Sequence, residues 1–255
     1  MLKLSAIGIS EEILNWVELW LENRKQRVTV DKSCSNWSRV RSGVPQGSVL
    51  GPLLFLIYIN DIDERLLNKL LKFADDTKLL GSASNQTEVN RFQDDINKLA
   101  EWSIKWQMPF NAGKCKIMHF GHNNRKVIYS LQNTALQEVQ EEKDIGVIVT
   151  ADFKVKAQCV KASKTGNMML GMIKRTMVAR NKKQLVKLYK SLVRPHLDYA
   201  IQAWRPRLHK DMEVLDKVQE RFTRMIEDCQ KLNYHERLRR IGLTTLSTIF
   251  ISRFD

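Results

Sequence analysis

The sequence predicts an α+β protein in which an antiparallel sheet precedes a helical, strongly basic region. Up to about residue 152, short apolar runs bounded by turn residues alternate with amphipathic segments, whereas the remainder shows apolar residues at helical spacing. The charge changes at the same point. Residues 1–152 carry 19 basic and 19 acidic side chains, and residues 153–200 carry 12 and 1. We therefore predict two domains, 1–152 and 153–255.

The composition indicates a folded protein outside the secretory route. A chain of 255 residues with 43% hydrophobic content can form a real core. Its four cysteines lack any C-x-x-C spacing, which argues against a zinc site and a disulfide framework. The longest apolar stretch, Val49 to Ile59, is too short to span a bilayer. We expect an intracellular protein, nuclear or cytoplasmic, with no membrane partner.

The first elements end in a loop rich in glycine and proline. Glu11 to Asn23 has helical apolar spacing, and the alternating residues Gln26 to Val30 predict a strand that pairs with Trp37 to Val40. The loop Ser42 to Pro52 then leads into an apolar helix, Leu53 to Ile62. Glycines in such a loop let a substrate approach the backbone closely. A plain turn before a buried helix fits the same spacing.

An acidic pair, Asp75-Asp76, lies between two short apolar runs that predict the arms of a β-hairpin. Both carboxylates would then lie at the tip and leave the core. Mg²⁺ binds carboxylates together with substrate phosphates, and two-metal phosphoryl transfer needs clustered carboxylates. An ordinary acidic turn is the alternative, since aspartate is a favoured turn residue.

The remaining pattern is one long helix, two strands and a helical end. Thr87 to Trp106 is the clearest amphipathic helix, and Cys115 to Phe120 and Asp144 to Val149 predict strands. Beyond them, residues 184–193 and 212–226 each place apolar side chains on one helical face. The helical end includes the basic segment 153–200, which fits a polyanion such as a phosphate backbone. A solvated basic face is the alternative.

Several segments in order carry a resemblance to a known family. Ser42 to Pro52, with its Ser-Gly-x-Pro-Gln-Gly-Ser box, and Phe73 to Asp76 resemble motifs B and C of the reverse transcriptases of non-LTR retrotransposons (LINE elements), most closely the jockey and chicken-repeat branch. Asn111 to Lys114 is similar to motif D and Ile145 to Val147 to motif E. Tyr58 to Ile62, Leu192 to Tyr199 and Val218 to Phe222 also match, so the resemblance covers essentially the whole chain.

This resemblance implies a right-hand polymerase fold and RNA-directed DNA synthesis. Residues 1–152 would form part of the palm and fingers, and 153–255 the thumb and a C-terminal extension. A primer 3′-hydroxyl would attack the α-phosphate of a deoxynucleoside triphosphate, with Mg²⁺ or Mn²⁺ as cofactor. The implied partners are an RNA template, a DNA primer and deoxynucleoside triphosphates, and the oligomeric state stays open.

Site residues follow from the resemblance position by position. Asp75 and Asp76 would be the metal ligands, and Lys114 would stabilise charge or donate a proton near the pyrophosphate, although a surface lysine is the plainer interpretation. Nucleotide and template would contact Ser42, Gly43, Pro45, Gln46 and Gly47. Primer support would come from Ile145, Gly146 and Val147. The nucleic-acid backbone would contact Lys174, Arg175, Lys182, Lys183 and Lys187.

One departure from the family pattern sets the expected activity. The family needs a further aspartate from motif A, upstream of motif B, yet only 41 residues precede Ser42. Asp31 is the only aspartate among them, and it lies in a polar turn. We therefore expect a 5′-truncated piece of a transposon reading frame that lacks the third metal ligand and the endonuclease domain and is inactive or nearly so.

Two other interpretations stay open from the sequence. One is a non-catalytic relic that binds nucleic acid through the basic helical segment, with an affinity that falls steeply with salt. Another is an untranslated relic without a stable fold, because a lost sheet edge would expose apolar surface and unpaired strand.

Overall fold

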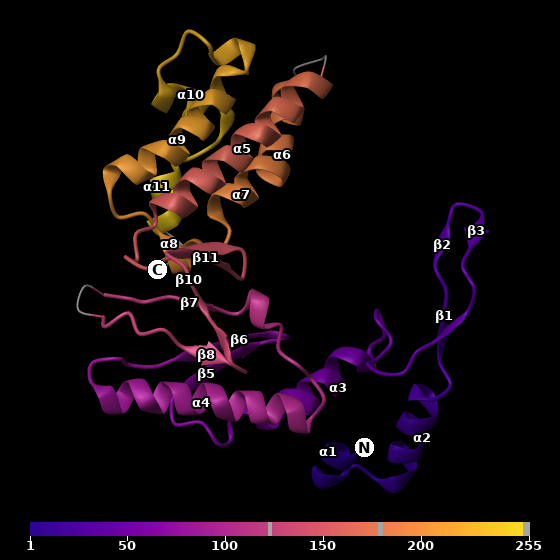
Figure 1. The fold of residues 1–255 in the computed structure, drawn as a ribbon. Coiled ribbons are helices and arrows are strands. Elements are labelled where there is room, and N and C mark those ends of the chain that lie inside the picture. Colours follow the sequence, from indigo (N-terminus) through magenta and orange to yellow (C-terminus); the bar gives the residue numbers. More distant parts are fainter. Residues whose placement is uncertain (122–123, 178–180, 252–255) are drawn as a thin grey trace. The chain divides into compact units, whose positions relative to one another are not determined.

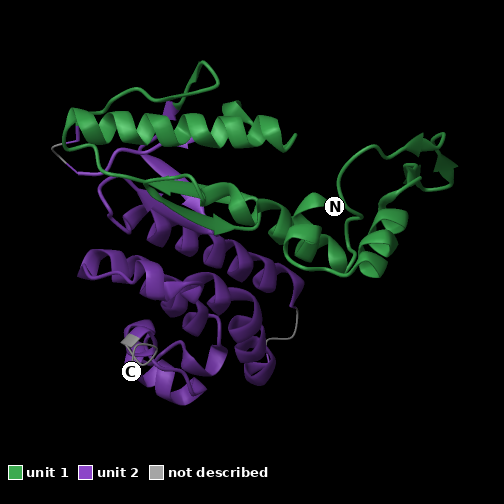
Figure 2. Cartoon of the chain, turned by 90° about the horizontal axis from the view of Figure 1, so that it is seen from below, with its two compact units in different colours: residues 1–115, 125–136 green, residues 116–124, 137–255 purple. Residues whose placement is uncertain are grey.

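The computed structural model describes residues 1–121, 124–177 and 181–251 and forms two compact units (Figures 1 and 2). Unit 1 comprises residues 1–115 and 125–136, and unit 2 comprises 116–124 and 137–255. Helices and short antiparallel strand pairs occur together, which confirms the predicted mixed α and β character. The domain boundary at residue 152 and the assignment to palm, fingers and thumb stay predictions.

Unit 1 combines four helices with short hairpins. Its helices are α1 (Leu2–Ala6), α2 (Glu11–Leu21), α3 (Leu50–Ile59) and α4 (Gln86–Lys105), with 3-10 turns η1 (Asn60–Asp63) and η2 (Ala112–Lys114). Its strands are β1 (Lys25–Gln26), β2 (Thr29–Val30), β3 (Ser33–Cys34), β4 (Ser38–Arg39), β5 (Lys69–Phe73), β6 (Asp76–Leu80), β8 (Ser130–Leu131) and β9 (Thr134–Ala135). The pairs are β1 with β4, β2 with β3, β5 with β6 and β8 with β9, all antiparallel.

The structure refines three predicted elements of unit 1. The apolar helix begins three residues earlier than predicted, at Leu50, and its last turn tightens into η1. The first hairpin pairs as predicted at Gln26 and Ser38, but a second short ladder closes it around Asp31, whose φ is 52°. Helix α4 matches the predicted amphipathic helix to within one residue at each end.

Asp95 fixes the start of the β5–β6 hairpin to α4. Its side chain is fully buried on α4, and its Oδ2 accepts hydrogen bonds from the backbone N–H groups of Leu67 (3.0 Å) and Asn68 (2.7 Å) and from Asn68 Nδ2 (3.0 Å). Lys98 Nζ lies 2.9 Å from its Oδ1. A buried carboxylate is stable only when hydrogen bonds and an opposite charge replace water. The corner before β5 therefore depends on this side chain.

Unit 2 places short strands before a helical bundle. Its strands are β7 (Lys116–Ile117), β10 (Gln137–Glu138), β11 (Glu141–Asp144) and β12 (Val147–Thr150). Its helices are α5 (Lys156–Thr176), α6 (Lys182–Leu188), α7 (Arg194–Asp198), α8 (Ile201–Trp204), α9 (His209–Arg224), α10 (Tyr234–Ile241) and α11 (Leu246–Ile251), with a π-helical turn η3 (Tyr189–Val193) and a 3-10 turn η4 (Glu227–Cys229). Strand β7 pairs in parallel with β10, and β11 pairs antiparallel with β12.

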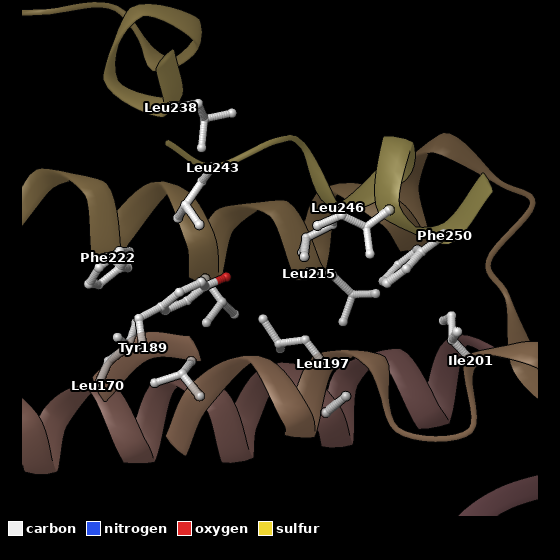
Figure 3. Packing of buried hydrophobic residues seen from close by; sticks show 14 of the residues in the cluster. Leu170, Tyr189, Leu197, Ile201, Leu215, Phe222, Leu238, Leu243, Leu246 and Phe250 are labelled. Atoms are coloured by element: carbon white, nitrogen blue, oxygen red, sulfur yellow. The ribbon is translucent and has the colours of Figure 1, made fainter. Parts of the chain in front are cut away.

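The bundle of unit 2 encloses a cluster of buried apolar residues (Figure 3). Tyr189 and Phe222 stack at its centre with ring centroids 4.2 Å apart, and Tyr189 Oη donates to Gln219 Oε1 (2.8 Å). Gly166 lets α5 approach its neighbours, since a Cβ there would lie 3.0 Å from Leu197 Cδ2 and 3.1 Å from Val218 Cγ1. The predicted helical character of this region is confirmed.

None of the helices in the described ranges is long and apolar enough to cross a bilayer. Arg180, one of the cations counted in the basic segment, lies outside the described residues.

Replacing Asp95 by Asn is expected to destabilise the chain by about 3 kcal/mol, because buried backbone donors lose a charged acceptor. Urea unfolding should show a lower midpoint at an unchanged slope. Asp94→Asn on the exposed face of the same helix is the control and should change stability by less than about 0.5 kcal/mol. Equal midpoints for the two variants would contradict the role of Asp95.

The same carboxylate gives a pH dependence. Burial raises the pKa of Asp95, but hydrogen bonds from Lys98, Asn68 and Leu67 outweigh burial and hold the pKa below its usual range. A depressed folded-state pKa adds stability above the unfolded value of about 4, which is lost as the pH falls through the folded pKa. The stability difference between wild type and Asp95→Asn, measured by urea unfolding at each pH, should therefore shrink below about pH 4.

Candidate polymerase site and basic groove

The predicted acidic hairpin forms, and the two carboxylates lie at its tip. β5 and β6 pair from Lys69 opposite Leu80 to Phe73 opposite Asp76, which leaves Ala74 and Asp75 as the connecting residues. Ala74 has a φ of 51°, the left-handed conformation that so short a connection requires. Asp75 and Asp76 are both exposed. Their charges therefore face solvent rather than packed hydrocarbon.

The hairpin is also held from its side. Lys72 Nζ on β5 lies 2.7 Å from Asp63 Oδ1 and donates to the Asn60 carbonyl (2.9 Å) in η1. With the Asp95 contacts at its base, the hairpin has two polar anchors, one on η1 and one on α4. The end of the Tyr58 to Ile62 segment forms the start of η1, so part of that segment helps to hold the hairpin.

The donor set at the tip fits an ion that arrives with a phosphate ligand. Two adjacent carboxylates supply oxygens of the type that Mg²⁺ and Mn²⁺ bind, and Mg²⁺ commonly takes one or two carboxylates plus substrate phosphates. In the part of the chain that the structure describes, no cluster of three or more His, Cys, Asp or Glu side chains is placed to hold a metal.

The glycine-rich loop is ordered by contacts within itself and by Arg24, whose guanidinium donates to the Gly43 carbonyl. Ser48 Oγ donates to the Pro45 carbonyl (2.7 Å) and accepts from the Gly51 N–H (3.0 Å). A Cβ at Gly51 would lie 2.8 Å from Ser48 Oγ and 3.1 Å from the Pro45 carbonyl oxygen, so a side chain there would displace the Ser48 hydroxyl from these hydrogen bonds. Gly43 and Gly47 have φ values of +79° and +78° with open space beside them, as close approach of a ligand to the backbone needs.

The other predicted site residues of unit 1 are accessible to solvent but are not joined to the acidic pair. Ser42 and Gln46 are exposed and Pro45 is half-buried, while Lys114 is exposed at the end of η2. Within the described ranges, no hydrogen bond or ion pair joins Lys114 or the glycine-rich loop to Asp75 or Asp76. Lys114, the glycine-rich loop and the acidic pair are therefore not connected by direct polar contacts among the described residues.

A tight turn divides the predicted strand Asp144 to Val149: Asp144 ends β11, and Val147 to Val149 lie in β12. Ile145 and Gly146 connect β11 to β12 with φ values of 42° and 84°, a backbone reversal that a continuous strand does not allow. Tyr199 Oη donates to the Ile145 carbonyl (3.2 Å), and Lys161 Nζ donates to the Gly146 carbonyl (3.0 Å). Ile145 is 45% exposed while Val147 is buried, so the turn presents one apolar side chain.

Several cations of the basic segment are engaged within the fold. Lys154 lies 2.8 Å from Asp152, and Lys182 Nζ donates to the Arg240 carbonyl (2.6 Å). Lys161 holds the turn at Gly146. By contrast Lys174 and Arg175 on α5, and Lys183 and Lys187 on α6, are exposed. Lys182 is half-buried and engaged with Arg240, and the assignment of all five cations to a nucleic-acid backbone stays a prediction.

A basic groove between α5 and α9 gathers cations that the sequence analysis had not combined. Its volume is about 510 Å³, and its charged lining residues are Lys174, Arg221 and Arg224, with Asn167 and Gln230 beside them. Arg221 donates to Asn167 Oδ1 (2.9 Å), which orients its guanidinium, and Arg224 lies 2.6 Å from Glu220. The signal in the sequence was the helical spacing of Asn167, Gly171 and Lys174 on one helix and of Arg221 and Arg224 on another.

Comparisons with known proteins agree with the motif assignment. Residues 1–173 match the family described as reverse transcriptase (RNA-dependent DNA polymerase). The chain is 29% identical over 209 residues to the RNA-directed DNA polymerase from mobile element jockey of Drosophila funebris (77% of the chain, 23% of the relative), and 27% over 203 residues to that of Drosophila melanogaster (74% and 22%). It is 28% identical over 229 residues to the probable RNA-directed DNA polymerase from transposon BS of Drosophila melanogaster (82% and 25%).

These relatives are much longer than the sequence in hand. The chain spans about a quarter of the length of the curated relatives it matches. No solved structure matches it. Because the family match covers more than half of the chain, the LINE-type assignment made from its motifs is confirmed, and the chain belongs to the reverse transcriptase family of RNA-directed DNA polymerases.

Proposed function

We propose that this chain carries the nucleotide-binding carboxylates of a LINE-type reverse transcriptase at Asp75 and Asp76. The observation that supports the proposal most directly is the anchored hairpin, which presents both carboxylates in solvent at a two-residue connection. The substrates would be deoxynucleoside triphosphates, extended from a DNA primer along an RNA template. In this proposal residues 1–152 belong to the palm and fingers, 153–255 to the thumb, and the location is intracellular.

The residues of the chain would act by position and charge. Asp75 and Asp76 would hold Mg²⁺ or Mn²⁺, which when bound supplies neutralising charge at the triphosphate. The loop at Gly43 and Gly47, which has open space beside both α-carbons, would receive the template and the incoming nucleotide. Lys114 would stabilise the leaving pyrophosphate, and the fixed turn at Ile145 and Gly146 would support the primer strand. With two carboxylates in the proposed set, we infer that activity of the chain alone is low.

Asp75→Asn is expected to weaken binding of Mn²⁺ together with a deoxynucleoside triphosphate by about tenfold, since one unit charge at close range near a surface is worth about 1–4 kcal/mol. Electron paramagnetic resonance of bound Mn²⁺ measures this affinity. Asp94→Asn, which removes an exposed charge elsewhere in unit 1, should leave it unchanged. An equal affinity for wild type and Asp75→Asn would sink the assigned role.

Primer extension on an RNA template gives a second measure of the same proposal. Any incorporation with Mg²⁺ or Mn²⁺ should fall by orders of magnitude in Asp75→Ala. Robust synthesis that survives this substitution would show that the acidic pair is not part of the polymerase site.

A second candidate function, binding of a nucleic-acid backbone without catalysis, is favoured by the groove between α5 and α9. Lys174 and Arg221 are exposed, and Arg224 is 64% exposed at its side chain despite its contact with Glu220. Arginine guanidinium groups match phosphate geometry well. This function needs no metal and makes no use of Asp75.

Combined substitution of Lys174, Arg221 and Arg224 by Ala is expected to weaken binding of a short RNA–DNA hybrid and to reduce the salt slope by about one per lost phosphate contact. Fluorescence anisotropy across a KCl series measures both. Lys217→Ala, an exposed lysine of α9 that does not line the groove, is the control. If the triple variant and the control show the same slope, the groove is only a solvated basic face.

A further inference from the structure

An aromatic cage in unit 1 encloses the ammonium group of Lys3. The Lys3 Nζ lies 3.8 Å from the centroid of the Trp106 ring, 4.9 Å from that of Trp102 and 5.0 Å from that of Tyr58. It also lies 2.5 Å from Asp61 Oδ1 and donates to the Tyr58 carbonyl. Aromatic faces and a carboxylate around one cation are the chemistry that recognises ammonium ions.

The walls of this cage are fixed to one another independently of Lys3. Trp102 Nε1 donates to Asp61 Oδ1 (2.9 Å), and Tyr58 Oη donates to the Trp106 carbonyl. The Tyr58 ring meets both indoles edge to face, at 6.4 Å from Trp102 and 6.0 Å from Trp106. The cage is therefore a site built by α3, η1 and the end of α4. Asp61, Trp102 and Trp106 also line a cavity of about 270 Å³.

Lys3 supplies the hydrogen bonds and the ion pair by which α1 contacts α3 and η1. This five-residue helix has no fully buried residue: Leu2 is 79% exposed and Leu4 is half-buried. A helix of that length is not stable in isolation. The Lys3 side chain, by contrast, is only 14% exposed, and that of Asp61 27%. Lys3 is therefore the polar attachment of α1 to unit 1, beside the apolar contact that the half-buried Leu4 provides.

We propose that Tyr58, Trp102, Trp106 and Asp61 form an ammonium-binding site, that Lys3 is its tethered ligand, and that its occupation holds α1 on unit 1. The site takes primary and methylated ammonium groups. Methylation of Lys3 would keep the cation and the attachment, whereas acetylation would remove the charge and release α1. None of these residues belongs to the acidic hairpin tip or the glycine-rich loop, so the inference is independent of the proposed polymerase site.

Hydrogen exchange of the full chain tests the attachment. Lys3→Met should raise amide exchange across residues 2–9 at least tenfold. The matched control is Lys105→Met, because Lys105 Nζ also lies near the Trp106 ring, at 5.4 Å, but forms no ion pair among the described residues. Faster exchange in the Lys3 variant alone is the expected result. Unchanged exchange at residues 2–9 in Lys3→Met would overturn the proposal.

A ligand added to the emptied cage tests its specificity. In the Lys3→Met variant n-butylammonium should bind at least tenfold more tightly than n-butanol, its neutral counterpart, as titrations followed by NMR would show. Adding Asp61→Asn should weaken this binding at least fivefold, and wild type should bind the ion no better than the alcohol because Lys3 competes. Equal binding of n-butylammonium and n-butanol by the Lys3→Met variant would refute an ammonium site.

The unsubstituted chain supplies a measurement that does not depend on a variant folding. Ring currents from Trp106 and Trp102 should move the Lys3 Hε proton resonances upfield of those of exposed lysines. If the Lys3 resonances coincide with those of exposed lysines in folded wild-type protein, the cage does not hold this side chain in solution.

Discussion

The carboxylate of Asp95 is the constraint on which the candidate polymerase site depends. A hairpin of two strands is marginally stable on its own, and β5 and β6 pair only with each other within the described residues. The buried Asp95 accepts three donors from residues 67 and 68, immediately before Lys69 opens β5. The start of the hairpin is thus held by an interaction whose loss would strongly destabilise the fold, because it would leave a charge buried without partners.

Polar contacts hold several elements of unit 1 in place because the apolar side chains of this unit are unevenly buried. Helix α3 is apolar on all sides, yet Leu53 and Leu56 are more than half exposed, and Phe73 on β5 is 59% exposed. Where apolar contact does not fix an element, directional contacts do: Lys72 reaches η1, Asp95 reaches the corner before β5, and Lys3 enters the aromatic cage. Unit 2 shows the opposite balance, with its helices around one apolar cluster (Figure 3).

The sequence predicts those parts of the structure that depend on local interactions. Helix α4 and the hairpin around Asp75 were predictable because apolar periodicity and register are local properties. The reversal at Ile145 was not, because a β-branched residue disfavours positive φ and is held there by Tyr199, far along the chain. The groove likewise needed Lys174 and Arg221 from two helices to meet. Asp95 looked like one more polar residue of an amphipathic helix.

The contacts of the family motifs show that their residues have different structural roles. Gly51 and Ser48 of the glycine-rich loop satisfy each other, so part of that motif specifies the loop's own geometry, while Gly43 and Gly47 leave open backbone. In the same way Asn60 and Asp63 hold the hairpin through Lys72, and Asp61 holds Lys3. Through Asn60 and Asp61, the Tyr58 to Ile62 segment thus contacts both the hairpin that carries Asp75 and the N-terminal helix. The same short stretch therefore orients two elements that neither periodicity nor apolar burial would fix.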